Sequence, residues 1–151
     1  MIALAIAPYQ RFRLSTIEVD KLEARYTVNT LELMQARYPE ASLMFITGTD
    51  LFAEIEEWNE YKRLFELASF AIVNRPGCPM RNDLNSVQVV NVQSKVSLSH
   101  TPSVYYLPSL DEDISSTEIR QQLRNGYEVG KSIPPAVLAY INSHNLYSER
   151  S

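Results

Sequence analysis

Cysteine, histidine and glycine are scarce in this sequence. It holds one cysteine, two histidines and four glycines in 151 residues. The single cysteine excludes an internal disulfide and any metal site built from several cysteines, and it is typical of a chain from a reducing compartment. His100 and His144 stand too far apart in the sequence for a zinc motif. No metal site with dedicated protein ligands is therefore predicted.

The sequence also lacks a basic surplus and a long apolar run. Its formal net charge is -4 at pH 7, so no nucleic-acid partner is expected. The apolar opening, residues 1–7, is short, ends at Pro8 and precedes its arginines, which is not the order of a secretory signal. No stretch has the length of a transmembrane helix. A cytoplasmic protein with no membrane partner is expected.

The first third of the chain alternates between strand and helix patterns. Apolar and polar residues alternate from Phe12 to Thr16, and Ile17 and Val19 follow, which predicts a strand with one exposed face. Residues 26–37 have helical spacing, with Thr27 as the expected N-cap and Pro39 as the stop. The opening residues 1–7 resemble the end of a helix.

Two continuous apolar runs, residues 43–46 and 70–73, predict strands buried on both faces. Between them, residues 51–67 are expected to form helical pieces broken near Trp58. Strands separated by helices are typical of a parallel α/β unit. The remaining expected elements are a surface loop at 76–86, strands at 87–92 and 104–107, a helix that stops at Gly126, and a last helix from Ala136 to about His144. The length predicts one domain over residues 1–151.

Three hydroxyl residues stand in a row in the segment 113–120, DISSTEIR, at an expected helix start. Ser115 and Glu118 have the spacing of a capping box, which needs one hydroxyl only. The alternative is a phosphate site, because free N–H groups at a helix start bind anions. Ser116 and Arg120 are four residues apart and share a helix face, where a hydroxyl and a guanidinium can meet one phosphate. The residues alone leave both interpretations open.

Polar residues directly follow the two apolar runs. Gly48 and Asp50 come after the first run, and Arg75 comes after the second. In open α/β sheets, ligands bind beyond the carboxyl ends of strands. Gly48 would let the backbone approach a ligand, Asp50 can accept hydrogen bonds from a ribose, and Arg75 can meet a nucleotide. The alternatives are a plain strand-to-helix turn with Asp50 as N-cap, and a turn after Arg75.

Two further features have alternative interpretations. Trp58, the only tryptophan, is either a core residue or a stacking platform for a flat ring. Tyr26 and Thr27 precede a helix and supply either a cap or a second anion site.

Together these segments resemble the bacterial nicotinate-nucleotide adenylyltransferases of the HxGH nucleotidylyltransferase superfamily. DISSTEIR is similar to the family's ISSTxIR signature, and FITGTD at 45–50 is similar to its F-I-x-G-x-D segment. YTVNTL at 26–31 resembles its Y-T-x-x-T-L helix start. Trp58, AIVNRPG at 71–77, PPAVLAYI at 134–141 and NLY at 145–147 follow in the family's order. The resemblance covers essentially the whole chain and implies a Rossmann-like nucleotidylyltransferase fold with a parallel sheet.

The resemblance implies a reaction and its participants. The phosphate of nicotinate mononucleotide would attack the α-phosphate of ATP, giving deamido-NAD and pyrophosphate in NAD biosynthesis, with Mg²⁺ held by the phosphates alone. Arg120 would be catalytic, because it would stabilise charge on the transferred phosphate. The implied contacts are Ser115, Ser116, Thr117 and Arg120 for the ATP phosphates, Gly48, Asp50 and Arg75 for the adenosine, and Tyr26, Thr27 and Trp58 for the mononucleotide.

Two features of the family are lacking. Its opening G-x-F-D-P-x-H-x-G-H segment, whose histidines contact the ATP phosphates, does not occur here, and Asn59 stands where an aromatic residue often follows the tryptophan. The sequence is therefore expected to be N-terminally incomplete, without the first strands of the sheet, and residues 43–46 are expected to form an open apolar edge. Residues 1–151 alone are expected to fold poorly and to make little dinucleotide.

Some alternatives stay open at this point. A second possibility is another adenylyltransferase of the superfamily, such as the phosphopantetheine type, although Tyr26, Thr27 and Trp58 favour a pyridine nucleotide. A third is a truncated, inactive chain that only binds nucleotide. The sequence leaves open the oligomeric state, a homo-oligomer included, and the choice between nicotinate and nicotinamide nucleotide.

Overall fold

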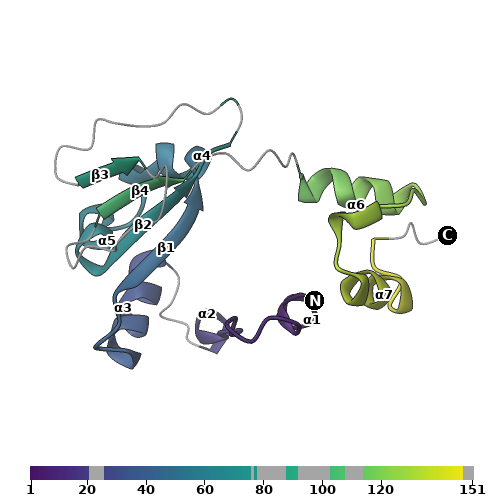
Figure 1. Ribbon diagram of the computed structural model, residues 1–151, viewed down its shortest axis with the longest axis horizontal. Coiled ribbons are helices and arrows are strands. Elements are labelled where there is room, and N and C mark those ends of the chain that lie inside the picture. The colour runs from purple at the N-terminus through teal and green to yellow at the C-terminus, as the bar shows by residue number, and fades with distance from the viewer. Residues whose placement is uncertain (21–25, 76, 78–87, 92–102, 108–113, 148–151) are drawn as a thin grey trace. The chain divides into compact units, whose positions relative to one another are not determined.

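The computed structural model describes residues 1–20, 26–75, 77, 88–91, 103–107 and 114–147. The chain forms two compact units (Figure 1). We call residues 16–111 the sheet unit, and residues 1–15 with 112–151 the helical unit. Cys78, His100, and residues 76 and 78–86 of the expected surface loop lie outside the described residues.

In the described residues, the sheet unit contains four parallel strands in the order β1-β2-β4-β3 (Figure 1). The pairing of β1 with β2 ends with Gly48 opposite Val73, so the carboxyl ends of these strands lie side by side. This arrangement confirms the predicted α/β class with a parallel sheet. The strands are β1 (Leu43–Gly48), β2 (Ala68–Val73), β3 (Gln88–Asn91) and β4 (Ser103–Leu107).

One face of the sheet is covered by helices whose apolar side chains form the core. Phe70 and Ile72 of β2 are fully buried there, together with Val28 and Leu64 from the helical layer. Burial of each such side chain contributes about 1.5–3 kcal/mol. The helical pieces between β1 and β2 break at Trp58, as predicted. The layer consists of α3 (Thr27–Arg37), α4 (Thr49–Ala53), the 3-10 helix η1 (Ile55–Glu57) and α5 (Tyr61–Leu67).

Residues 12–16 form no strand, so that prediction is wrong. Phe12 and Leu14 are 59% and 49% exposed. The N–H groups of Val19 and Asp20 both donate to the carbonyl of Thr16 at 2.8 Å. These local hydrogen bonds close the short helix α2 (Ile17–Asp20). An alternation over five residues describes an extended segment without ensuring a neighbouring strand.

β1 is buried on one face only, which contradicts the prediction of burial on both. Phe45 packs against the core and Thr47 is buried, whereas Met44 and Ile46 are 37% and 68% exposed. Within the described residues β1 lies at the edge of the sheet and pairs with β2 alone. A second buried face needs a covering layer, which an apolar run in the sequence does not reveal. β2 fits the prediction, since residues 70–72 are all buried.

The start of α3 is shifted by one residue from the prediction. Tyr26 is the N-cap and Thr27 is the first helical residue. The side chain of Tyr26 makes no capping hydrogen bond. The helix ends at Arg37, shortly before Pro39, as expected. The first-turn N–H groups of α3 therefore receive no cap from the Tyr26 side chain.

The helical unit contains α1 (Ile2–Ile6), α6 (Ser116–Arg124), the 3-10 helix η2 (Gly130–Ser132) and α7 (Pro135–Ser143). α1 packs against α7. Val137 and Ile141 of α7 are buried, and Leu138 is partly buried. Proline in the first turn suits α7, because those N–H groups have no partner within the helix.

α6 ends at the predicted glycine. Gly126 has a φ of +72°, the left-handed conformation that favours this residue. Its N–H donates to the carbonyl of Leu123 at 3.2 Å, and the N–H of Tyr127 donates to the carbonyl of Gln122 at 2.9 Å. These two hydrogen bonds form a Schellman motif, which satisfies carbonyls at the end of the helix.

Candidate functional site

Three of the predicted nucleotide contacts lie together beyond the carboxyl ends of β1 and β2. Gly48 ends β1, Asp50 follows in α4, and Arg75 comes two residues after the end of β2. Arg75 Nη1 donates a hydrogen bond to Asp50 Oδ2 at 2.9 Å. The convergence follows from the parallel pairing, because residues that leave neighbouring parallel strands emerge at one edge of the sheet.

A side chain at Gly48 would push aside two neighbouring side chains. A Cβ there would lie 2.3 Å from Asp50 Oδ1 and 3.3 Å from Arg75 Nε. The backbone of Gly48 is extended, with φ -86° and ψ 162°, a conformation that any residue adopts. Space is therefore the reason for glycine at this position, and the acid and the guanidinium both lie close over its backbone.

Asp50 is the second residue of α4 and Gly48 is the N-cap, so the alternative of Asp50 as N-cap is wrong. The carboxylate faces Arg75 instead. Its Oδ1 is buried and has no hydrogen-bond partner among the described residues. The Arg75 side chain is 65% exposed, so the ion pair contributes little to stability. The arrangement offers a ligand one accessible guanidinium, whereas the unpaired carboxylate oxygen is enclosed by the protein.

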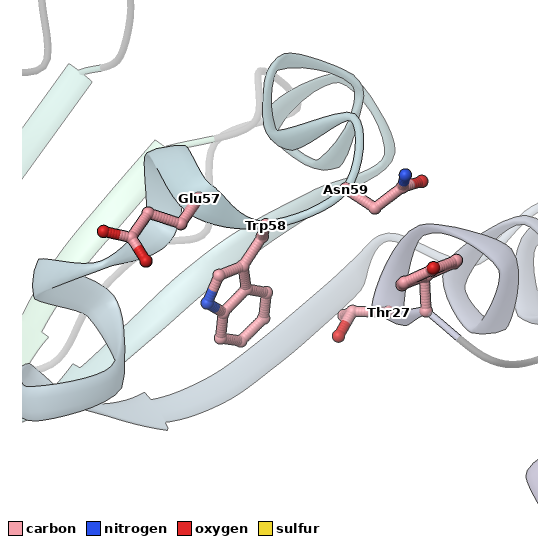
Figure 2. A pocket seen from close by; sticks show the side chains of 5 residues that line it. Thr27, Glu57, Trp58 and Asn59 are labelled. Atoms are coloured by element: carbon pink, nitrogen blue, oxygen red, sulfur yellow. The ribbon is translucent and has the colours of Figure 1, made fainter.

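A second site gathers the three residues predicted to bind the mononucleotide. Tyr26, Thr27 and Trp58 line one opening of about 280 Å³, together with Glu57 and Asn59. The start of α3 supplies the first two, and the segment between η1 and α5 supplies Trp58 and Asn59. Figure 2 shows the indole of Trp58 and the side chain of Thr27 on facing sides of this opening.

Trp58 belongs partly to the core and partly to the opening. Its ring meets Phe45 edge to face, with centroids 6.0 Å apart and an interplanar angle of 87°. The side chain is partly buried against the core and also lines the opening. Packing against the core therefore explains the burial of part of the indole. The use of the indole as a stacking platform stays a prediction.

Glu57 and Thr49 belong to these sites but were not predicted. Glu57 directly precedes Trp58. The predicted break between the helical pieces, which drew attention to Trp58, could therefore have identified Glu57 as well. Thr49 Oγ1 accepts a hydrogen bond from the backbone N–H of Arg75 at 2.9 Å. No local signal identifies this contact, because it joins residues 26 positions apart.

The DISSTEIR segment has the predicted cap. Ser115 is the N-cap of α6, and its Oγ accepts the N–H of Glu118 at 3.5 Å. Ser116, Thr117 and Arg120 lie in the first turns of α6 and are exposed. All of them are in the helical unit, whereas the two sites above are in the sheet unit. The cap uses one hydroxyl, so it does not account for the other two.

We expect Ser115→Ala to lower the free energy of unfolding by about 0.5–2 kcal/mol, because it removes the N-cap acceptor of α6. Ser116→Ala is the matched control, since it removes a neighbouring exposed hydroxyl that is not the N-cap, and it should change stability by less than about 0.5 kcal/mol. Urea unfolding followed by circular dichroism measures both. Equal losses in the two variants would contradict the assignment of the cap.

No group of three or more histidine, cysteine or acidic side chains is placed to hold a metal ion in the described part of the chain. His144 lies at the C-cap of α7, where its ring stacks on Tyr140 at 4.0 Å. Position and stacking give it a structural role at the helix end. Among the helices that the structure describes, none combines the length and apolarity needed to cross a bilayer.

Comparisons with known proteins match nearly the whole chain. The cytidylyltransferase-like family matches residues 1–122. A protein from Hydrogenovibrio crunogenus named "probable nicotinate-nucleotide adenylyltransferase" is 35% identical over 97% of this chain and 71% of its own length. A protein of the same name from Corynebacterium jeikeium is 35% identical over 97% of this chain and 72% of its own length.

A solved structure has a similar fold. The Plasmodium falciparum nicotinic acid mononucleotide adenylyltransferase complexed with APC has a TM-score of 0.60 and 22% sequence identity to this chain. The match covers 83% of this chain and 60% of the other. At this identity the likeness concerns the fold alone, and it agrees with the parallel α/β architecture of the sheet unit.

Proposed function

The chain belongs to the cytidylyltransferase-like family and, within it, to the nicotinate-nucleotide adenylyltransferases, and we propose that it transfers the adenylyl group of ATP to nicotinate mononucleotide. A phosphate oxygen of the mononucleotide attacks the α-phosphorus of ATP. The bond from that phosphorus to the bridging oxygen of the β-phosphate breaks, and pyrophosphate leaves with the electron pair. The product is deamido-NAD. Mg²⁺ arrives on the phosphates of ATP as part of the substrate.

The gathering of Tyr26, Thr27 and Trp58 around one opening is the observation that supports this proposal. A pyridine ring is flat, and one polar group projects from its edge. Trp58 offers an aromatic face for stacking, and Thr27 offers a hydroxyl for the polar group.

The start of α3 favours nicotinate over nicotinamide. Thr27 is the first helical residue, and the Tyr26 side chain does not cap the helix. The positive end of the helix dipole favours an anion by about 0.3–1 kcal/mol at an exposed site, and the first N–H groups can bind it. A neutral carboxamide gains much less from the dipole. Glu57 also lines the opening, but Figure 2 shows its carboxylate on the side of the indole away from Thr27.

The other candidate residues are assigned to ATP in this proposal. In this proposal Gly48, Asp50 and Arg75 contact the adenosine, and the partly exposed carboxylate of Asp50 accepts a ribose hydroxyl. Residues 115–117 and Arg120 hold the phosphates at the start of α6. Catalysis then consists of positioning and charge stabilisation, with no side chain covalently attached to the substrate.

An assay with the protein at its full natural length tests the proposal. With ATP, Mg²⁺ and nicotinate mononucleotide, we expect deamido-NAD and pyrophosphate in equal amounts. Nicotinamide mononucleotide, tested in parallel, should react with a lower kcat/KM. Adenylylation of phosphopantetheine without reaction of either pyridine nucleotide would contradict the proposal and support the other adenylyltransferase class.

Trp58→Ala is expected to raise KM for nicotinate mononucleotide about tenfold, or about 1.4 kcal/mol, which lies within the range of ring stacking on an aromatic side chain. KM for ATP should stay within about twofold, because Trp58 lies in the opening with Tyr26 and Thr27 and not with Gly48 and Arg75. Trp58→Phe keeps a flat ring and should recover most of the affinity. Steady-state kinetics with each substrate varied in turn measures both values. An equal rise in the two KM values with a lower melting temperature would leave Trp58 as a core residue only.

A further inference from the structure

We infer that Thr49 is a positioning residue for ATP, because its hydroxyl holds the backbone of Arg75 at the nucleotide site. This inference rests on the proposed function for its kinetic test. Thr49 begins α4 directly after β1 and is only 2% exposed. Its Oγ1 accepts the backbone N–H of Arg75 at 2.9 Å. The acceptor is thus supplied from the interior, where water cannot easily replace it.

The hydrogen bond lies just beyond the end of the β1–β2 ladder. The last pair of the two strands is Gly48 with Val73. After this pair Thr49 enters α4 and Arg75 leaves the sheet. Beyond the last backbone pair, the hydrogen bond from the Arg75 N–H to the Thr49 hydroxyl therefore still joins the two chain segments. It anchors the main chain of Arg75 at the point where the side chain departs toward the site.

We expect the position of the Arg75 guanidinium to depend on this anchor, because the side chain is largely exposed and has one ion pair among the described residues. Its side chain is 65% exposed, and its ion-pair partner is Asp50, at 2.9 Å. Arg75 Cδ lies 3.4 Å from where a Cβ on Gly48 would be, so the arm runs close over the glycine. A binding group displaced by about 1 Å can cost a large factor in rate or affinity. Release of the Arg75 backbone should therefore weaken ATP binding.

The alternative is a purely structural role for Thr49, in which the hydroxyl only satisfies a partly buried N–H group. Kinetics separate the two roles. Thr49→Val keeps the shape and removes the acceptor, and we expect KM for ATP to rise about 5- to 10-fold. KM for nicotinate mononucleotide and kcat should stay within about twofold, because the opening at Trp58 is a separate site. Thr49→Ser restores the hydroxyl and should restore KM for ATP.

A double variant tests whether Thr49 acts through Arg75. In the Arg75→Ala background, Thr49→Val should raise KM for ATP no further, since the guanidinium that the anchor positions is already absent. Fully additive losses would overturn the inference. The same holds for equal rises in both KM values, or for a serine variant as impaired as the valine variant. Should the valine variant not fold, Thr49→Ala takes its place with the same expected result.

A failure of the proposed function is distinguished by titration of ATP alone. If the unmodified protein forms no dinucleotide, the proposed function fails and the role of Thr49 is judged on ATP binding by calorimetry. Weaker binding by Thr49→Val with recovery in Thr49→Ser then supports the inference. Equal affinities of the three proteins, or no binding of ATP by the unmodified protein, overturn it.

Discussion

Replacement of Arg120 by alanine is expected to lower kcat/KM for ATP by a factor of about 10² to 10³. Arg120 lies one turn after Ser116 on α6 and is exposed. Helical side chains lean toward the N-terminus of their helix, where first-turn N–H groups also favour a phosphate. A guanidinium there would stabilise the charge on the phosphate during transfer. Loss of one such donor costs about 2.7–4 kcal/mol.

Arg124 provides the matched control for this substitution. It is a basic residue in the last turn of the same helix and is also exposed. Arg124→Ala should cost about 0.3–1 kcal/mol of stability through the helix dipole and leave kcat/KM within about threefold. Steady-state kinetics with varied ATP measures both variants. A near-normal Arg120→Ala enzyme, or equal losses in the two variants, would remove Arg120 from the proposed catalytic role.

The elements that the sequence predicted well are those with several local signals. α6 has a capping serine at its start and a glycine at its stop, and the structure has both, with Ser115 as N-cap and Gly126 in the left-handed conformation. β2 is an apolar run with turn residues behind it, and it is buried as predicted. In each case the residues that predict the element are neighbours in the sequence and also interact in the structure. The interaction can therefore be predicted from a short stretch of sequence.

The elements that were wrongly predicted depend on partners remote in sequence. The alternation from Phe12 to Thr16 is typical of a strand, but a strand needs a neighbouring strand to pair with. In the structure this segment is followed by α2, which local hydrogen bonds close. The apolar run of β1 suits a doubly covered strand, but Ile46 is 68% exposed. Neither result can be predicted from the local sequence, because each depends on which other elements pack beside the segment.

The same distinction applies to the site. The convergence of Gly48, Asp50 and Arg75 follows from the rule that parallel strands present their carboxyl ends together. The prediction that Tyr26 and Trp58 line one site came from the resemblance to the family and not from a local sequence pattern. The role of Asp50 was ambiguous, since a turn with Asp50 as N-cap was an equally local interpretation. Only the fold shows that its carboxylate faces a guanidinium 25 positions away.

Gly48→Ala is expected to weaken ATP binding about 30- to 100-fold, with little change in the stability of the fold. The new Cβ would lie 2.3 Å from Asp50 Oδ1 and 3.3 Å from Arg75 Nε, so both side chains must move away. The proposed adenosine contacts would be displaced together, and 100-fold corresponds to about 2.7 kcal/mol. The Arg75 side chain is 65% exposed, so loss of its ion pair with Asp50 costs little stability. Alanine also makes the unfolded chain less flexible than glycine does, which stabilises the folded state by about 0.4–1 kcal/mol and offsets part of any loss of stability.

A double variant identifies the cause of the Gly48→Ala effect, which calorimetric titration of ATP and thermal unfolding both measure. Asp50→Ala removes the carboxylate that a Cβ at Gly48 would meet first. If displacement of Asp50 causes the loss, Gly48→Ala should weaken ATP binding little further in that background. A full additional loss would instead mean that the methyl group obstructs the nucleotide at the backbone of Gly48. Unchanged ATP affinity of the single variant, with a normal melting temperature, would show that neither the backbone of Gly48 nor the position of Asp50 contributes to the site.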